Sequence, residues 1–197
     1  MSESPTEKTG VSNWNIANVL TVLRILMVPV FVWTLFQDSG ESVGWRWAAV
    51  AIFALASLTD KIDGNLARSR GLITNLGKIL DPIADKFLTG AALISLSVLG
   101  EVWWWVTIVI LGRELIITAM RFVVIRYAVL PASRGGKLKT VLQMLAIGAF
   151  LLPLFVLPGF IHAIAVVLMA LALIVTVGSG VDYLFTGYRV FTQGRRG

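Results

Sequence analysis

The sequence predicts an all-α integral membrane protein with six transmembrane helices, because it is strongly apolar and its apolar residues form long segments. Hydrophobic residues make up 57% of the 197 residues and charged residues 14%, whereas ordinary soluble domains contain roughly 25% charged residues. Each apolar segment is close to the ~20 residues that a spanning helix needs. The six segments are residues 19–36, 45–67, 79–99, 103–126, 138–157 and 160–185.

Polar stretches at both ends of the chain frame one membrane domain. Residues 1–13 are polar and are expected to form a flexible cytoplasmic tail. Residues 14–188 contain all six apolar segments, and residues 189–197 are expected to form a short basic cytoplasmic tail. No internal repeat or low-complexity tract divides the central region. We therefore expect a single six-helix domain.

Positively charged residues gather in alternate loops, and this predicts the orientation. The loops at residues 68–78 and 126–139 contain several Lys and Arg, whereas the other loops contain Asp38, Glu41 and Glu101, with Arg46 as their only base. Cytoplasmic loops carry an excess of Lys and Arg, so both termini are expected on the cytoplasmic side of the cell (inner) membrane. The net charge of +6 then reflects these loops and anionic lipid headgroups, not a nucleic-acid partner.

The residue types present exclude several kinds of metal site. The chain has no Cys and a single His, His162, so disulfides, thiolate sites and imidazole clusters are excluded. A metal site in this protein must use oxygen ligands. Such ligands favour hard cations such as Mg²⁺ or Mn²⁺.

Four aspartates lie inside the apolar segments, where ionisable groups are costly and mark functional sites. Asp60 and Asp63 lie near the end of the second segment, and Asp81 and Asp85 near the start of the third. Each pair shares a helix face, and the short loop between them predicts antiparallel neighbouring helices with converging carboxylates near the cytoplasmic side. Such a cluster needs cations, and two divalent ions suit the departure of a pyrophosphate. The alternative is structural ion pairing, but four acids exceed what simple pairing requires.

These aspartates belong to a longer pattern, Asp60-x2-Asp63-Gly64-x2-Ala67-Arg68-x8-Gly77-x3-Asp81-x3-Asp85. The pattern resembles the full signature of the CDP-alcohol phosphatidyltransferases, and the resemblance to that family's six-helix fold covers nearly the whole chain. It implies that the four aspartates bind two Mg²⁺ or Mn²⁺ ions and that Asp85 takes the proton from the acceptor hydroxyl. It also implies contacts to the cytidine diphosphate of the donor from Gly64, Ala67, Arg68 and Thr74.

A second group of charged residues predicts the nature of the acceptor. The fourth segment contains Gly112-Arg113-Glu114 and, seven residues after the Glu, Arg121; the fifth opens with Gly136-Lys137-Leu138-Lys139-Thr140-x2-Gln143. Four cations close to a metal site favour an anionic acceptor, a phosphomonoester. Two alternatives stay open: Lys137 and Lys139 as topogenic charges at the membrane surface, and Arg121 as a structural partner of Glu114.

These acceptor-side residues and the segment Asn15-Ile16-Ala17-Asn18-Val19-Leu20-Thr21-x2-Arg24 are similar to the phosphatidylglycerolphosphate synthase branch of the family, which more often has Pro in place of Ala17. The resemblance implies that Asn18 and Thr21 lie near CDP-diacylglycerol and Arg24 near its phosphates. It further implies sn-glycerol 3-phosphate as the acceptor, with phosphatidylglycerol phosphate and CMP as products. The implied acceptor contacts are Arg113, Arg121, Lys137 and Lys139.

Other activities remain as alternatives. With phosphatidylglycerol as acceptor the chain would be a cardiolipin synthase, and with inositol phosphate a phosphatidylinositol-phosphate synthase. A cation-coupled transporter is a more distant alternative, since it predicts acids spread across the membrane depth and not clustered at one side. The family resemblance also suggests a homodimer surrounded by membrane lipids.

Overall fold

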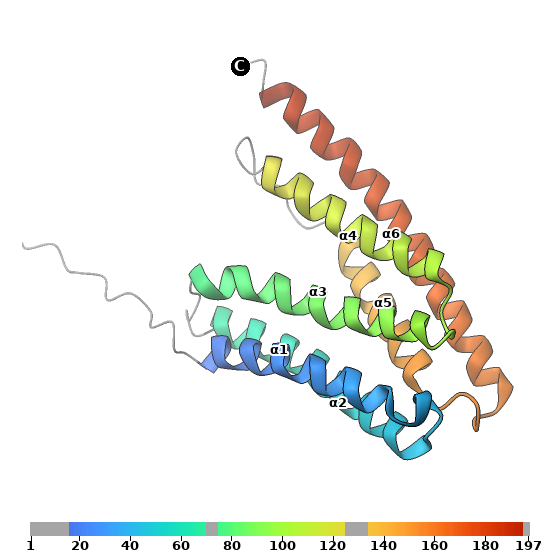
Figure 1. The fold of residues 1–197 in the computed structure, drawn as a ribbon. Helices are drawn as coiled ribbons and strands as arrows, with labels where there is room; N and C mark the ends of the chain where they lie inside the picture. Colours follow the sequence, from blue (N-terminus) through green and yellow to red (C-terminus); the bar gives the residue numbers. More distant parts are fainter. Residues whose placement is uncertain (1–15, 70–74, 125–133, 195–197) are drawn as a thin grey trace, which may run out of the picture.

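The computed structural model describes residues 16–69, 75–124 and 134–194, and this part of the chain folds into six α-helices without a strand (Figure 1). The number and order of the predicted helices are therefore confirmed for the described residues. A short 3-10 helix, η1 (Gln37–Gly40), follows the first of them. The α-helices are α1 (Ile16–Leu35), α2 (Val43–Ser69), α3 (Asn75–Val98), α4 (Trp104–Val124), α5 (Arg134–Leu151) and α6 (Gly159–Gly194).

The largest differences between the helices and the predicted apolar segments lie at the C-terminal ends of α5 and α6. Helix α5 ends at Leu151 and not at residue 157, because Pro153 cannot donate to the helical hydrogen-bond ladder. Helix α6 continues past residue 185 to Gly194, and so runs through most of the stretch that we expected as a tail, residues 189–197. Polarity rises there, but no proline interrupts the helix.

Helix α1 lies along both α2 and α3 (Figure 1), and among the described residues it contacts each of them more extensively than they contact each other. The rings of Phe31 on α1 and Phe53 on α2 have centroids 5.9 Å apart. Small buried residues on α2, Ala49 and Ala56, allow the backbones to approach closely. The two helices that the short loop predicts to be neighbours do contact each other, and α1 adds a more extensive contact to each of them.

The remaining helices form a second group in which α6 packs against α4 and α5. Helices α4 and α6 diverge from α1, α2 and α3 toward the end of the molecule at which α6 terminates (Figure 1). One apolar core joins the two groups. Its fully buried members include Val28, Phe31, Leu88, Leu96, Ile110, Ile147 and Leu151.

The opposite end of the molecule is closed by a group of contacts that we call the loop clamp, formed by Gly40, Arg46 and Glu101. Arg46 is 3% exposed, donates a hydrogen bond to the carbonyl of Gly40 at 2.6 Å and forms an ion pair with Glu101. Gly40 has a φ of +81°, a conformation that favours glycine. The clamp therefore joins the turn after α1, the start of α2 and the loop after α3.

Two stretches of the described residues are long and apolar enough to cross a bilayer, Asn18–Leu35 in α1 and Gly159–Thr186 in α6. Two shorter apolar stretches are Val43–Thr59 in α2 and Leu138–Leu151 in α5. The charged residues inside α2, α3 and α4 lower the hydropathy of those helices. These are the helices that carry most of the predicted site.

Candidate active site

The four signature aspartates are carried by two helix ends that lie at the same end of the molecule (Figure 1). Asp60 and Asp63 belong to the C-terminal part of α2, and Asp81 and Asp85 to the N-terminal part of α3. The side chains of Asp60, Asp63 and Asp81 lie outside the described residues, so their convergence stays a prediction. The same applies to the predicted nucleotide contacts Gly64, Ala67, Arg68 and Thr74.

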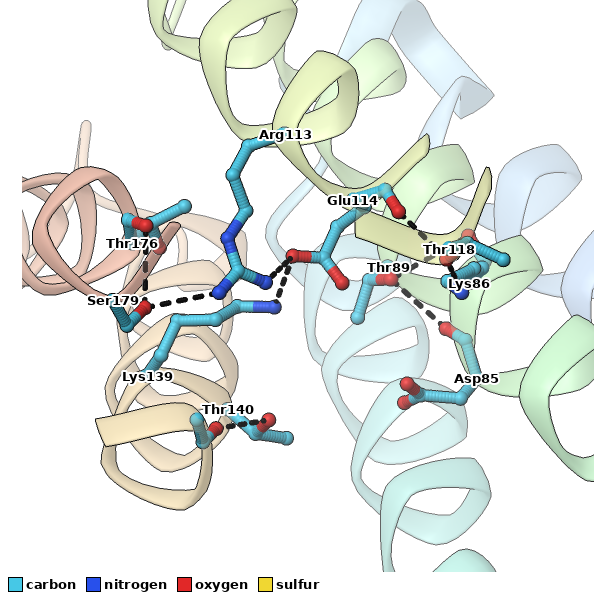
Figure 2. Close-up of polar contacts among 11 residues, drawn as sticks. Asp85, Lys86, Thr89, Arg113, Glu114, Thr118, Lys139, Thr140, Thr176 and Ser179 are labelled. Atoms are coloured by element: carbon cyan, nitrogen blue, oxygen red, sulfur yellow. Dashed lines mark hydrogen bonds and ion pairs between the residues drawn. The ribbon is translucent and has the colours of Figure 1, made fainter. Parts of the chain in front are cut away.

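Asp85 is the signature aspartate whose side chain the structure describes. It is partly buried on α3, and its carboxylate points toward the side on which Glu114 and Lys139 lie (Figure 2). The backbone carbonyl of Asp85 accepts a hydrogen bond from Thr89 Oγ1 at 2.9 Å. A base at this position therefore faces the cations that we predicted for the acceptor.

Three polar side chains of α1 are buried between the helices. Asn18, Thr21 and Arg24 are 5%, 1% and 1% exposed, and their spacing of three residues places them on one face of the helix. Arg24 Nε donates a hydrogen bond to the carbonyl of Ala56 on α2 at 3.2 Å, one turn before Asp60. The predicted donor contacts on α1 thus face inward, next to the part of α2 that leads to the aspartates.

A second polar group joins three helices, and we call it the cation cluster: Arg113 and Glu114 of α4, Lys139 of α5 and Ser179 of α6 (Figure 2). Glu114 Oε1 accepts hydrogen bonds from Arg113 Nη1 at 2.9 Å and from Lys139 Nζ at 2.6 Å. Arg113 Nη2 donates to Ser179 Oγ at 3.1 Å. Two cations share one carboxylate, so this group of side chains carries an excess positive charge.

Three buried polar atoms in and beside the cation cluster have no hydrogen-bond partner among the described residues: Arg113 Nε, Gln143 Oε1 and Thr176 Oγ1. Gln143 lies one turn after Lys139 on α5, and Thr176 lies one turn before Ser179 on α6. Buried polar groups are normally paired. The N–H of Arg113 Nε and the hydroxyl of Thr176 can donate to an anionic ligand, whereas Gln143 Oε1 accepts and suits a donor such as a hydroxyl group.

A polar link fixes the helix of Asp85 against the helix of the cation cluster. Lys86 of α3 donates a hydrogen bond to the hydroxyl of Thr118 on α4. Thr118 Oγ1 in turn donates to the backbone carbonyl of Glu114 at 2.7 Å. The position of Asp85 relative to Arg113 and Glu114 is therefore set by side chains as well as by helix packing.

The structure brings together part of the predicted acceptor site. Of the four predicted cations, Arg113 and Lys139 meet at Glu114, while the side chains of Arg121 and Lys137 lie outside the described residues. Lys139 is 6% exposed, so its interpretation as a charge on the membrane surface does not fit. Glu114, which we considered as a partner for Arg121, pairs with two other cations.

Sequence reasoning missed the contribution of α6 to this site. Thr176 and Ser179 lie in an apolar helix, 63 and more residues after Arg113 in the sequence, and no spacing rule connects residues so far apart. The available signal was weak. Small polar residues in the middle of an apolar helix are typical of contacts between helices.

The residues present fit a hard divalent cation. Among the described residues no group of three or more His, Cys, Asp and Glu could hold a metal ion, since three of the signature side chains fall outside that part of the chain. The donor chemistry nevertheless agrees with the prediction. Carboxylate oxygens are the ligands that Mg²⁺ prefers, and the chain offers no thiolate that would select a softer metal.

Comparison with known proteins finds one family and several named relatives. The sequence matches the CDP-alcohol phosphatidyltransferase family over residues 14–178. A probable phosphatidylglycerophosphate synthase of Mycobacterium tuberculosis (strain ATCC 25618 / H37Rv) is 54% identical over 89% of this chain and 82% of that protein. A CDP-diacylglycerol–glycerol-3-phosphate 3-phosphatidyltransferase of Bacillus subtilis is 40% identical over 71% of this chain and 77% of its own length. The CDP-diacylglycerol–glycerol-3-phosphate 3-phosphatidyltransferase of Haemophilus influenzae is 34% identical over 87% of this chain and 92% of its own length.

The matched residues include the four signature aspartates, the buried polar face of α1 and most of the cation cluster. Identities of 54% and 34% also extend over most of the length of both the chain and these two relatives. The chain therefore belongs to the CDP-alcohol phosphatidyltransferase family.

Proposed function

We propose that the chain transfers the phosphatidyl group of CDP-diacylglycerol to sn-glycerol 3-phosphate and releases phosphatidylglycerol phosphate and CMP. The names of its relatives support this donor and this acceptor. The observation that carries the choice of acceptor is the cation cluster, in which Arg113 and Lys139 share the single carboxylate of Glu114. A phosphomonoester satisfies the excess positive charge, because its oxygens accept charge-assisted hydrogen bonds from both cations.

In the transfer, the free hydroxyl oxygen of the acceptor attacks the phosphorus on the lipid side of the diphosphate. The bond from that phosphorus to the bridging oxygen breaks, and CMP leaves with the electron pair. We assign removal of the hydroxyl proton to Asp85, whose carboxylate faces Glu114 and Lys139 (Figure 2). An acceptor whose phosphate lies at Arg113 and Lys139 would direct its hydroxyl toward this carboxylate.

Metal ions complete the proposed site. Asp60, Asp63, Asp81 and Asp85 would hold two divalent ions, Mg²⁺ or Mn²⁺, which when bound offset the negative charge of the diphosphate. The acid-only donor set supports this assignment.

The donor is proposed to bind between α1, α2 and the loop that follows α2. Arg24 lies on the inward face of α1 and reaches α2 at Ala56, so it can supply positive charge to the phosphates. Small residues in the C-terminal part of α2 would leave room for the nucleotide. The complete set of proposed donor contacts is Asn18, Thr21, Arg24, Gly64, Ala67, Arg68 and Thr74.

We further propose that all six helices cross the cytoplasmic membrane as a homodimer, with the active site facing the cytoplasm. Large apolar side chains on the outside of the bundle support a lipid environment: Leu26 is 61% exposed, Ile108 63% and Ile174 66%. Extended apolar surface of this kind is rare on proteins surrounded by water. The basic loops support the cytoplasmic orientation.

A panel of acceptors tests the proposed reaction. The purified chain is supplied with CDP-diacylglycerol and Mg²⁺ and with glycerol 3-phosphate, inositol phosphate, serine or phosphatidylglycerol in turn. We expect CMP release with glycerol 3-phosphate alone, its loss on chelation of the metal, and its recovery when Mg²⁺ or Mn²⁺ is added back. CMP release with phosphatidylglycerol or inositol phosphate in place of glycerol 3-phosphate would contradict the proposal.

The reverse reaction separates a transferase from a transporter. When CMP is added to the chain together with phosphatidylglycerol phosphate, a transferase forms CDP-diacylglycerol. We expect this product. If no CDP-diacylglycerol formed and vesicles that contain the chain transported a cation across their membrane, the transporter would be favoured.

A further inference from the structure

Helix α6 holds the side chain of Arg113 through two neighbouring residues. Arg113 Nη2 donates to Ser179 Oγ at 3.1 Å, and Ser179 Oγ donates to the carbonyl of Thr176 at 3.2 Å. Ser179 thus accepts from the guanidinium while its own proton is directed back into its helix. This arrangement fixes the hydroxyl as an acceptor for Arg113.

Gly180 provides the space in which Arg113 lies. A Cβ atom at position 180 would be 3.0 Å from Arg113 Cγ, 3.1 Å from Nε and 3.6 Å from Cδ. Ordinary contacts of carbon atoms are about 3.5–4.0 Å, so any larger residue would push the middle of the Arg113 side chain away from α6. The free end of a long side chain could swing aside, but these atoms lie close to the backbone of α4.

Thr176, Ser179 and Gly180 occupy positions i, i+3 and i+4 of α6 and therefore share one helix face. The fully buried Thr176 Oγ1 and the buried Arg113 Nε have no hydrogen-bond partner among the described residues. This face of α6 thus borders the same unsatisfied polar region as the cation cluster.

We propose that Ser179 and Gly180 are positioning residues of the acceptor site: Gly180 makes room for Arg113, and Ser179 orients its guanidinium toward the acceptor phosphate. Arg113 then presents Nη1 to Glu114 and Nη2 to Ser179, and its charge is held beside Lys139. This role rests on the proposed binding of glycerol 3-phosphate by Arg113. It assigns to α6 a function in substrate selection that the signature aspartates do not provide.

A pair of glycine variants tests the proposal with a matched control. Gly180→Ala adds the clashing methyl group, whereas Gly178→Ala adds the same group on the same helix with no atom within 4 Å. Both changes raise helix propensity equally, so both variants should fold. We expect Gly180→Ala to raise KM for glycerol 3-phosphate about tenfold, the effect of one weakened charge-assisted hydrogen bond, with KM for CDP-diacylglycerol unchanged. Gly178→Ala should leave both values unchanged.

Variants of Ser179 test the hydrogen bond separately. Ser179→Ala removes the acceptor of Arg113 Nη2 and should also raise KM for glycerol 3-phosphate, whereas Ser179→Thr keeps the hydroxyl and should restore a value near that of the unmodified chain. Equal effects of the Ala and Thr substitutions would contradict the proposed role of the hydroxyl.

A double-variant cycle distinguishes this role from the role of Arg113 itself. In an Arg113→Ala background the methyl group has no side chain to displace, so Gly180→Ala should cause no further rise in KM. A tenfold rise in both backgrounds would overturn the positioning role. If Arg113→Ala alone left KM for glycerol 3-phosphate unchanged, the assignment of Arg113 to the acceptor would fail. If Arg113→Ala raised this KM but Gly180→Ala did not, only the proposed role of α6 would be overturned.

Discussion

The loop clamp and the cation cluster are both ion-pair groups between helices, but their charges are balanced differently. In the loop clamp, Arg46 faces one carboxylate, Glu101, and also donates to the carbonyl of Gly40. In the cation cluster, Arg113 and Lys139 share the one carboxylate of Glu114. The first group is neutral, and the second carries an excess positive charge.

The two groups also differ in how completely their polar atoms are hydrogen-bonded. No side-chain atom of Arg46 or Glu101 is among the buried polar atoms without a partner, whereas Arg113 Nε is, together with Gln143 Oε1 and Thr176 Oγ1 beside it. A buried ion pair whose hydrogen bonds are all made has no free donor for a ligand, and breaking it by removing one partner destabilises the fold. An unsatisfied, positively charged group is suited to bind an anion. The comparison thus separates a satisfied structural contact from the group that we propose binds the acceptor.

The largest effect is expected at the carboxylate that faces the cation cluster. Asp85→Asn keeps the size of the side chain but removes the general base and one metal ligand, so kcat should fall roughly 10²–10⁴-fold. The measurement is CMP release at saturating donor and acceptor. Asp182→Asn, a change of the same kind at an exposed position of α6, is the control and should keep full activity. Retained activity in Asp85→Asn would remove Asp85 from the site.

The next largest effect is expected in the loop clamp, where a substitution should lower the stability of the fold. Glu101→Ala leaves the guanidinium of Arg46 buried without its carboxylate, and Glu101 is only 27% exposed. We expect a loss of about 1–3 kcal/mol in the free energy of unfolding, measured as a lower thermal midpoint in detergent. KM for glycerol 3-phosphate should not change. A selective rise in that KM would erase the distinction between the two groups.

The smallest effect concerns the glycine that closes the loop clamp. Gly40 and Gly100 have φ values of +81° and +75°, so replacement of either by Ala should cost about 1 kcal/mol of strain. At Gly40 the new Cβ would also lie 3.1 Å from Leu99, whereas Gly100 has open space. The thermal midpoint of Gly40→Ala should therefore be lower than that of Gly100→Ala. Equal midpoints would show that crowding at the clamp is unimportant.

The sequence predicted the helices well, because a long apolar segment is typical of a helix that is surrounded by lipid or by a protein core. The order of all six helices followed from hydropathy alone, and the largest differences at the ends arose where α5 stops before Pro153 and where α6 continues to Gly194. Packing was predicted less completely. The short loop after α2 predicted that α2 and α3 are neighbours, and they contact each other, but the packing of α1 against both helices was not predicted.

The candidate site was predicted where its residues are close in sequence. The aspartates and the pair Arg113–Glu114 form local patterns that chemistry can interpret directly. Ser179 and Gly180 do not, because their contact with Arg113 arises only when α6 packs against α4. Likewise, the charge of Lys139 was visible in the sequence, whereas its pairing with Glu114 depends on how α4 and α5 meet.

One measurement tests most directly whether the cation cluster receives the acceptor phosphate. Initial rates of Arg113→Ala are determined while glycerol 3-phosphate and CDP-diacylglycerol are varied separately. KM for glycerol 3-phosphate should rise at least about tenfold, since a charge-assisted hydrogen bond is lost, while KM for CDP-diacylglycerol changes less than about twofold. An equal rise in both values would mean that Arg113 supports the fold or the donor, and that the excess charge of the cluster serves another purpose.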